Sequence, residues 1–226
     1  MAISRHPGQV GRRAQKVEDK RARIFTAASA LFAEIGYERA TTQQISDRAD
    51  IAAGTLFRYA ATKGELLLMV YNEQFRTALE RGDRESRSES DPAQAVLTML
   101  RPILEAAQDN VENAVAYQRE LLFGSPADTY RAEGLALVAQ LEAMIANRLI
   151  EDARAHGADP PDLGYRAQLA GRSAFAVLHL TLARPATGAH PGQDAVKDLC
   201  AQVLQIVTGF CAELGYHAAS GKEGQA

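Results

Sequence analysis

Apolar residues recur at helical spacing along almost all of this chain, and this periodicity constrains its fold more than any other feature. Val, Ile and Thr never alternate with polar residues for long enough to predict a strand. The first clear stripe lies in residues 18–35, where Ile24, Leu31 and Phe32 share one helical face and Gly36 supplies the stop. The pattern predicts an all-α protein with about nine helices.

Two short helices are predicted to follow the first one. Residues 41–49 form the second helix, because Thr41 and Gln44 have the spacing of a capping box. The third helix lies within residues 53–60, and a longer fourth helix spans residues 63–81. Two short helices that are joined by a tight turn and covered by a longer helix form a helix-turn-helix unit. A tight helical corner with a solvated polar face explains these features equally well.

The third helix has the side chains that a DNA-reading helix needs. The major groove is about 12 Å wide, and Ala53, Gly54 and Thr55 keep the leading face of this helix small. Arg58 is the best candidate for reading a base, and hydroxyl and ammonium groups nearby can bind phosphates. The candidate DNA-binding residues are Thr41, Thr42, Ala53, Gly54, Thr55, Phe57, Arg58, Tyr59 and Lys63.

Residues 31–67, LFAEIGYERATTQQISDRADIAAGTLFRYAATKGELL, resemble the DNA-binding region of the TetR family of bacterial transcriptional regulators. The resemblance implies a three-helix DNA-binding domain over residues 18–78, with its helix-turn-helix at about 41–60. It also implies a larger helical domain for effector binding and dimerisation over residues 79–218, followed by a flexible tail at 219–226. The matching positions are Leu31, Phe32, Gly36, Thr41, Ile45, Gly54, Thr55, Leu56, Tyr59, Lys63 and Leu66.

Five positions depart from the family pattern. Phe57 replaces a usual Tyr and removes a hydroxyl directed at phosphate, while Ala60 replaces a usual Phe and leaves a packing gap. Ala52 stands where Ser or Thr commonly caps the third helix, a loss of about 1 kcal/mol. Asp50 replaces a Gly of the turn and tolerates a left-handed conformation. Gly64 replaces the usual acid and would let the backbone approach a phosphate.

The N-terminal third is the basic part of the chain. Residues 1–70 hold 11 Lys and Arg against 7 Asp and Glu, a net charge of +4. Residues 71–226 hold 14 against 21, a net charge of −7, and the two parts sum to −3. Within an expected flexible arm at residues 1–17, Arg12, Arg13 and Lys16 would add phosphate or minor-groove contacts. A solubilising tail is the alternative interpretation.

Five further helices are predicted, at about 92–107, 111–123, 125–155, 165–183 and 194–214. The last helix carries an apolar seam suited to close packing against other helices. An intramolecular core explains such a seam, but the resemblance favours a homodimer through the last two helices. A twofold dimer would read the two half-sites of a palindromic operator. The interface residues would be Val196, Cys200, Val203, Val207, Phe210 and Leu214.

The resemblance also implies an effector pocket in the larger domain. Flexible Met and aromatic side chains suit an apolar pocket, although each is equally typical of plain core. Glu112, Arg119 and Glu120 lie on a largely apolar helix and are either surface charges or the polar end of the pocket. The candidate pocket residues are Met99, Tyr117, Phe123, Met144, Phe175 and His179.

Other functional classes find little support in the sequence. The five histidines are scattered and no Gly-rich phosphate loop occurs, so no catalytic residue, cofactor or metal is expected. Cys200 and Cys211 do not make a disulfide framework. The apolar run at 66–71 is too short for a bilayer and no secretory signal is present, which predicts a cytoplasmic protein without membrane contact.

Together these features predict a sequence-specific DNA-binding regulator, more specifically a homodimeric repressor that a small-molecule effector releases from its operator. An all-helical scaffold that binds a protein partner and no DNA is the alternative.

Overall fold

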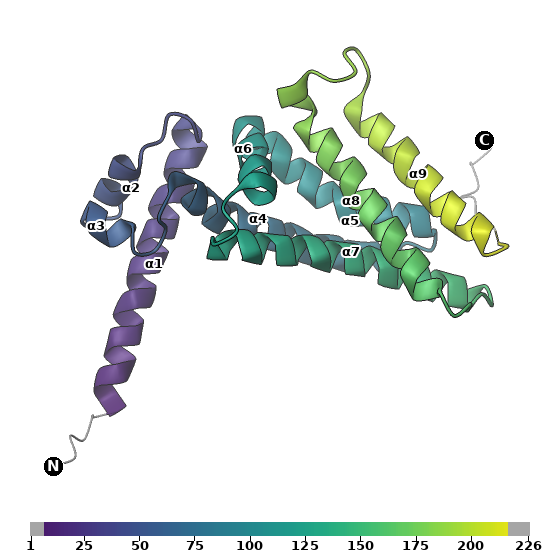
Figure 1. The fold of residues 1–226 in the computed structure, drawn as a ribbon, viewed down its shortest axis with the longest axis horizontal. Coiled ribbons are helices and arrows are strands. Elements are labelled where there is room, and N and C mark those ends of the chain that lie inside the picture. The colour runs from purple at the N-terminus through teal and green to yellow at the C-terminus, as the bar shows by residue number, and fades with distance from the viewer. Residues whose placement is uncertain (1–6, 217–226) are drawn as a thin grey trace.

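The computed structural model describes residues 7–216, with side chains described from residue 15 onward. The expected all-α fold is confirmed, because the described residues form nine α-helices and no strand (Figure 1). The helices are α1 (Pro7–Ile35), α2 (Thr42–Arg48), α3 (Ala53–Leu56), α4 (Lys63–Ser86), α5 (Pro92–Asp109), α6 (Val111–Phe123), α7 (Thr129–Ala155), α8 (Leu163–Thr187) and α9 (Ala195–Glu213).

The first three helices form a small N-terminal unit at one end of the molecule (Figure 1). Its core is made by Ile24 and Phe32 of α1, Ile45 of α2 and Leu56 of α3, all of them buried. The predicted capping box is present, since Thr41 accepts a hydrogen bond from the Gln44 backbone and Gln44 accepts one from the Thr41 backbone. The start of α2 is thereby fixed by its own sequence.

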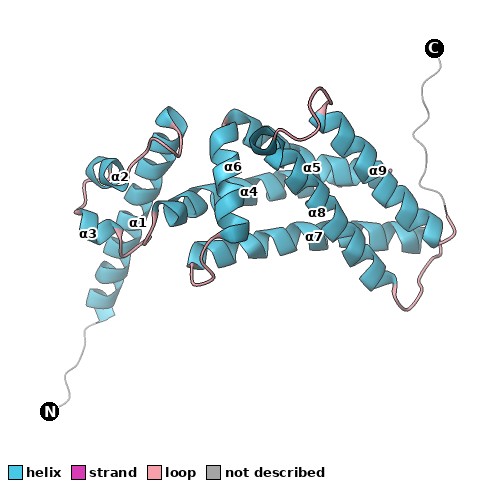
Figure 2. Cartoon of the chain, turned by 45° about the horizontal axis from the view of Figure 1, so that its top comes forward, coloured by secondary structure: helices cyan, strands magenta, loops and turns pink. Residues whose placement is uncertain are grey.

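Helix α4 leads from the N-terminal unit into a bundle of the remaining helices (Figure 2). Within this bundle α4 packs on α5 and α7, and α8 packs on both α7 and α9. The fully buried Leu100, Leu141, Ile145 and Leu149 supply much of its core. Capping by Asp91 and a proline at the first helical turn start α5 where the sequence predicted.

Several predicted boundaries need correction. Helix α1 begins at Pro7, so the basic segment expected to be flexible is helical from residue 7 onward. Helix α7 begins at Thr129 instead of at residue 125, because the Asp128 side chain accepts hydrogen bonds from the Tyr130 and Arg131 backbones. Helix α8 continues to Thr187, past the predicted end at residue 183. The expected tail at 219–226 lies outside the described residues.

Helix α9 contacts the bundle through the seam that was expected to face a second subunit. Val203, Val207 and Phe210 are buried against their own chain, where α9 packs on α5 and α8. The intramolecular alternative is therefore correct for these residues, although Val196 is exposed and Cys200 is half-buried. Among the described helices, α9 alone is long and apolar enough to cross a bilayer, a criterion that the core helix of a bundle also meets.

Candidate functional site

The helix-turn-helix consists of α2, a tight turn and a very short α3. Asp50 in the turn has a φ of 51°, the left-handed conformation that its residue type tolerates. Ala52 precedes α3 without a side-chain cap, as expected from its sequence. Leu56 is fully buried and holds α3 against the N-terminal core, and Ala60 is also buried there. The third helix thus depends on packing for its position.

The outward side of α3 is open and carries a free cation. A Cβ built on Gly54 would meet no atom within 4 Å. Phe57 is 48% exposed, and the Arg58 side chain is exposed and makes no hydrogen bond or ion pair to any described residue. A small leading face followed by an unengaged guanidinium has the shape and chemistry to enter a groove and donate to a base edge.

Tyr59 and Lys63, which are predicted to donate to phosphates, also make contacts within the chain. The Tyr59 ring is half-buried, and its hydroxyl lies 3.4 Å from the Val17 carbonyl oxygen of α1. The Lys63 ammonium donates to the carbonyl oxygens of Tyr37 and Glu38 at 2.8 and 3.2 Å. It also lies over the Tyr37 ring at 4.3 Å from the centroid. Both side chains therefore hold the N-terminal unit together.

The N-terminal part of α1 projects beyond α2 and α3 (Figure 1). Every residue from 15 to 23 is exposed, and the polar contacts of this section with the rest of the described chain are limited to the Tyr59 hydroxyl at the Val17 carbonyl oxygen and an exposed ion pair of Arg23 with Asp50. Lys16, Lys20 and Arg21 lie on it, and it offers cations to a polyanion from a preformed helix. The side chains of Arg12 and Arg13, which were predicted to contact DNA, lie outside the described part.

Helix α6 is joined to the turn after α1 by a buried asparagine. Asn113 is fully buried, its side-chain oxygen accepts from the Tyr37 backbone N–H at 2.6 Å, and its amide nitrogen donates to the Phe32 carbonyl oxygen at 2.8 Å. These bonds give the Tyr37 N–H its partner and add a second donor to the Phe32 carbonyl oxygen, which also accepts from the Gly36 backbone N–H. Asn113 thus connects the N-terminal unit to the bundle.

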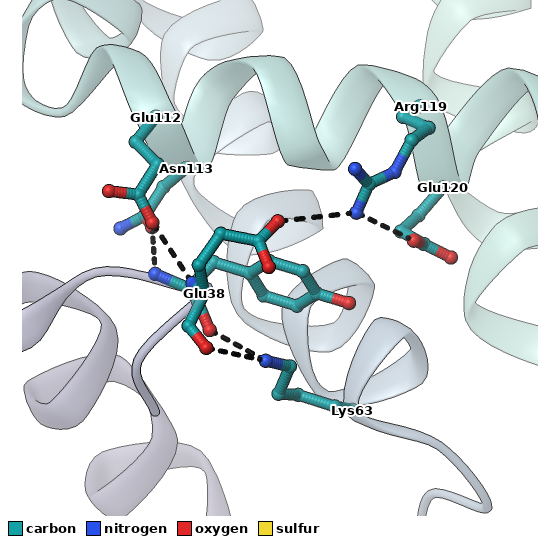
Figure 3. A network of polar contacts seen from close by, with 7 residues as sticks. Glu38, Lys63, Glu112, Asn113, Arg119 and Glu120 are labelled. Atoms are coloured by element: carbon teal, nitrogen blue, oxygen red, sulfur yellow. Dashed lines mark hydrogen bonds and ion pairs between the residues drawn. The ribbon is translucent and has the colours of Figure 1, made fainter. Parts of the chain in front are cut away.

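Charged residues surround this contact, as Figure 3 shows. Glu112 accepts a hydrogen bond from the Glu38 backbone N–H at 2.9 Å, and Arg119 lies 3.7 Å from the Glu38 carboxylate. The Glu120 carboxylate approaches the start of α4, where a Cβ built on Gly64 would lie 2.6 Å from it. None of the three charges lines the apolar cavity of the bundle, so the predicted role at the polar end of a pocket is wrong, whereas Glu112 and Arg119 are surface charges that face the N-terminal unit. Gly64 admits a carboxylate of the same chain instead of a phosphate.

The opposite side of α6 lines a narrow apolar cavity of about 70 Å³ in the bundle, which is partly open to solvent. Of the predicted pocket residues, Tyr117, Phe175 and His179 line it. Met99 is buried core, Met144 packs against that core, and Phe123 is 82% exposed at the end of α6. The other lining residues were not predicted from the sequence; they are Tyr71, Gln74, Phe75, Ala78, Ile103, Ala106, Ala107, Ala114, Gln118, Leu121, Leu178 and Leu182.

The polar groups of this cavity are uncharged at neutral pH. The Tyr117 hydroxyl donates to Asn72 at 2.9 Å, and burial raises the pKa of Tyr117. Burial also raises the pKa of Tyr71, whose ring stacks on Tyr117, and lowers the pKa of His179 below its ordinary value. The buried Gln118 could have been suspected, because it follows Tyr117 on a helix whose apolar face enters the bundle.

The outer sides of α8 and α9 present apolar side chains to solvent. On α8 these include Leu180, which is 69% exposed, and on α9 they include Leu204, which is 51% exposed. The exposed residues recur at helical spacing, so each helix has one unpartnered face. The members of these faces are Tyr165, Leu169, Ala176 and Leu180 on α8, and Ala201, Leu204, Thr208 and Ala212 on α9.

Comparison with known proteins gives consistent matches. A family profile described as "Bacterial regulatory proteins, tetR family" matches residues 24–70. The HTH-type transcriptional repressor KstR of Mycobacterium tuberculosis is 30% identical over 137 residues, which are 61% of this chain and 59% of that protein. The chain thus spans about three-fifths of the length of this curated relative.

Solved structures resemble nearly the whole chain. Thermus thermophilus FadR, a TetR family transcriptional repressor in complex with lauroyl-CoA, has a TM-score of 0.68 and 25% identity, covering 91% of this chain and 98% of its own. FadR from Bacillus subtilis in complex with stearoyl-CoA has a TM-score of 0.61 and 18% identity, covering 83% and 98%. At 18% identity, the resemblance to the Bacillus subtilis protein shows only that the two chains share a fold.

Proposed function

Because the chain belongs to the TetR family of bacterial regulatory proteins, we propose that it is a homodimeric transcriptional repressor that a small molecule releases from DNA. The observation that supports this proposal most directly is the open outward side of α3. Gly54 lies near the start of this helix, and Arg58, whose guanidinium has no partner among the described residues, follows its end. Small residues beside a free guanidinium suit base recognition in a major groove.

Four groups of contacts would hold the protein on DNA. Arg58 reads a base edge, with Thr55 and Phe57 beside it, and the free N–H groups at the start of α2, near Thr41 and Thr42, bind phosphate. The cations on the projecting section of α1 add phosphate or minor-groove contacts. Lys63 has a third N–H beyond its two carbonyl contacts, and this N–H is available to a phosphate.

A dimer would form through the exposed faces of α8 and α9 instead of through the buried seam of α9. These faces carry large apolar side chains such as Leu180 and Leu204, which a second subunit would remove from water. An isologous contact of this kind places two α3 helices on one duplex, each reading one half-site of a palindrome.

Effector binding would reach the DNA-binding unit through α6. One side of this helix lines the cavity with Ala114, Tyr117 and Gln118, while Glu112 and Asn113 on another side hold the turn after α1. A ligand that shifts α6 therefore also shifts the attachment of the N-terminal unit. Coupling of this type requires the ligand to bind the two arrangements with different affinity.

The proposal is tested by selecting the preferred DNA site from a random pool and measuring affinity for it across a salt series. A repressor of this kind binds one palindromic site tightly and loses affinity steeply with salt. Arg58→Ala should reduce that affinity by about tenfold or more and relax the preference at one base pair. Arg154→Ala, at the far end of α7, is the matched control. Weak binding that ignores sequence would favour the scaffold alternative.

A further inference from the structure

Among the described residues, no Lys, Arg, Asp or Glu side chain lines the cavity between α4, α5, α6 and α8. Its two tyrosines have raised pKa values and its histidine a lowered one, so all three are neutral at physiological pH. An ammonium or carboxylate placed there would lose its hydration and gain no opposite charge. The part of a ligand that enters this cavity is therefore uncharged.

One polar group of the lining is left without a partner. Gln118 is only 8% exposed, and its side-chain oxygen is buried with no hydrogen bond to the described chain. The neighbouring Tyr117 hydroxyl cannot serve it, because that group already donates to Asn72. Buried polar atoms in folded proteins nearly always have partners. An unpaired amide oxygen beside an apolar cavity thus points to a partner supplied by a ligand.

Neither opening of the cavity offers an unpaired cation. Toward α1 the lining continues into a hollow with Glu73, Glu105 and Asp109, whose only cation, Arg81, is bonded to Glu85 and Glu105. Toward the start of α9 it continues into a hollow with Arg184. That guanidinium is bonded to Asp198 at 3.1 Å and to backbone carbonyl oxygens of the loop between α8 and α9. An anionic group on the ligand would therefore find no free partner at either end.

We propose that the ligand of this cavity is an uncharged, largely apolar molecule with a hydroxyl group, which hydrogen-bonds to the side-chain amide of Gln118. A hydroxyl both donates and accepts, so it can pair with either end of an amide. This inference rests on the proposed function in one respect: it identifies the ligand of the cavity with the effector. Gln118 is then the residue that sets specificity for the polar group.

The test measures binding to the protein without DNA, by isothermal titration calorimetry at neutral pH. The probes are octanol, its methyl ether, octanoate and octanoyl-CoA, which share one alkyl chain. Octanol should bind at least about tenfold more tightly than the ether, and octanoate more weakly still. Gln118→Leu should remove the preference for octanol over the ether. Gln140→Leu, at an exposed glutamine of α7 that does not line the cavity, should leave that preference intact.

The unliganded Gln118→Leu protein supplies an independent readout. Removing a buried oxygen that has no partner should raise its thermal midpoint by about 2–4 °C. Preferential binding of octanoate or octanoyl-CoA over octanol, or no binding of any probe, would overturn the inference. So would an unchanged preference in Gln118→Leu. None of these results touches DNA binding, so the proposed repressor function can stand while this inference fails.

Discussion

The side-chain oxygen of Asn113 accepts a hydrogen bond of 2.6 Å from the backbone N–H of Tyr37, which joins α6 of the bundle to the turn that follows α1. The Asn113 side chain is fully buried and also donates to the Phe32 carbonyl oxygen. The two parts of the molecule are thus connected by a satisfied polar contact inside the protein. Such a contact transmits a displacement better than exposed ion pairs, which contribute little energy.

Asn113→Ala should destabilise the protein by about 1–3 kcal/mol, because it leaves the buried Tyr37 N–H without a partner and removes a second hydrogen bond to the Phe32 carbonyl oxygen. Chemical denaturation measures this loss. Asn147→Ala, at an exposed asparagine of α7, should change stability by no more than about 0.5 kcal/mol. In DNA titrations the Asn113 variant should also respond less to effector than the wild type. Equal stability of the two variants would mean that the buried contact contributes nothing.

Gly54→Ala should separate stability from DNA binding. The new methyl group enters open space in a helix, so the protein should gain about 0.5–1 kcal/mol of stability. The same methyl group would meet the DNA, and fluorescence anisotropy should show weaker operator binding. Gly164→Ala, also in open space but on α8, should stabilise without this loss. If the Gly54 variant bound the operator with full affinity, α3 would not be part of the DNA interface.

Leu204→Glu should convert a dimer into monomers, because it places an unpaired carboxylate in the proposed contact between two α9 helices. Analytical ultracentrifugation measures the change. Phe123→Glu alters an even more exposed apolar side chain on α6 and should leave the dimer intact. Phe210→Ala should instead destabilise each subunit, by about 3–5 kcal/mol, since this residue belongs to the core. A dimer that survives Leu204→Glu would place the contact elsewhere.

His179 should make stability depend on mildly acidic pH. Burial lowers its pKa in the folded protein, so the unfolded chain takes up the proton first. The contribution of His179 is therefore complete above the ordinary imidazole pKa of about 6.5 and declines as the pH falls below it. Thermal midpoints of the wild type and His179→Asn, measured on both sides of that pH, should diverge at the acidic end. His190→Asn, in the exposed loop before α9, should follow the wild type.

The local signals of the sequence predicted much of the fold. The Thr41 capping box, the Asp91 cap and the apolar stripes were sufficient because each acts within one or two turns of helix. Boundaries failed where two local signals competed, as at Ser125 and Asp128, both of which can cap a helix start. The start of α1 was missed because residues 7–17 have no apolar stripe to mark a helix.

The candidate site was harder to predict, because it depends on which side of a helix faces which neighbour. The seam of α9 has the correct spacing, but spacing alone cannot distinguish packing on α5 from packing on a second subunit. Likewise, Met99 and Phe175 are equally suited to a pocket by composition, and only the fold places one in the core and the other at the cavity. The contact of Lys63 with Tyr37 could not be predicted from local spacing either, because it joins residues 26 positions apart in the chain.

The close approach of Glu120 to Gly64 makes the two positions depend on one another. A Cβ at position 64 would lie 2.6 Å from that carboxylate, so the flexible Glu120 side chain would have to move aside, and an acidic side chain would also repel it. An acid at position 64 would therefore fit better beside a smaller or cationic residue at position 120. The effects of substitutions at the two positions should be non-additive, so that the start of α4 and the middle of α6 change as a pair.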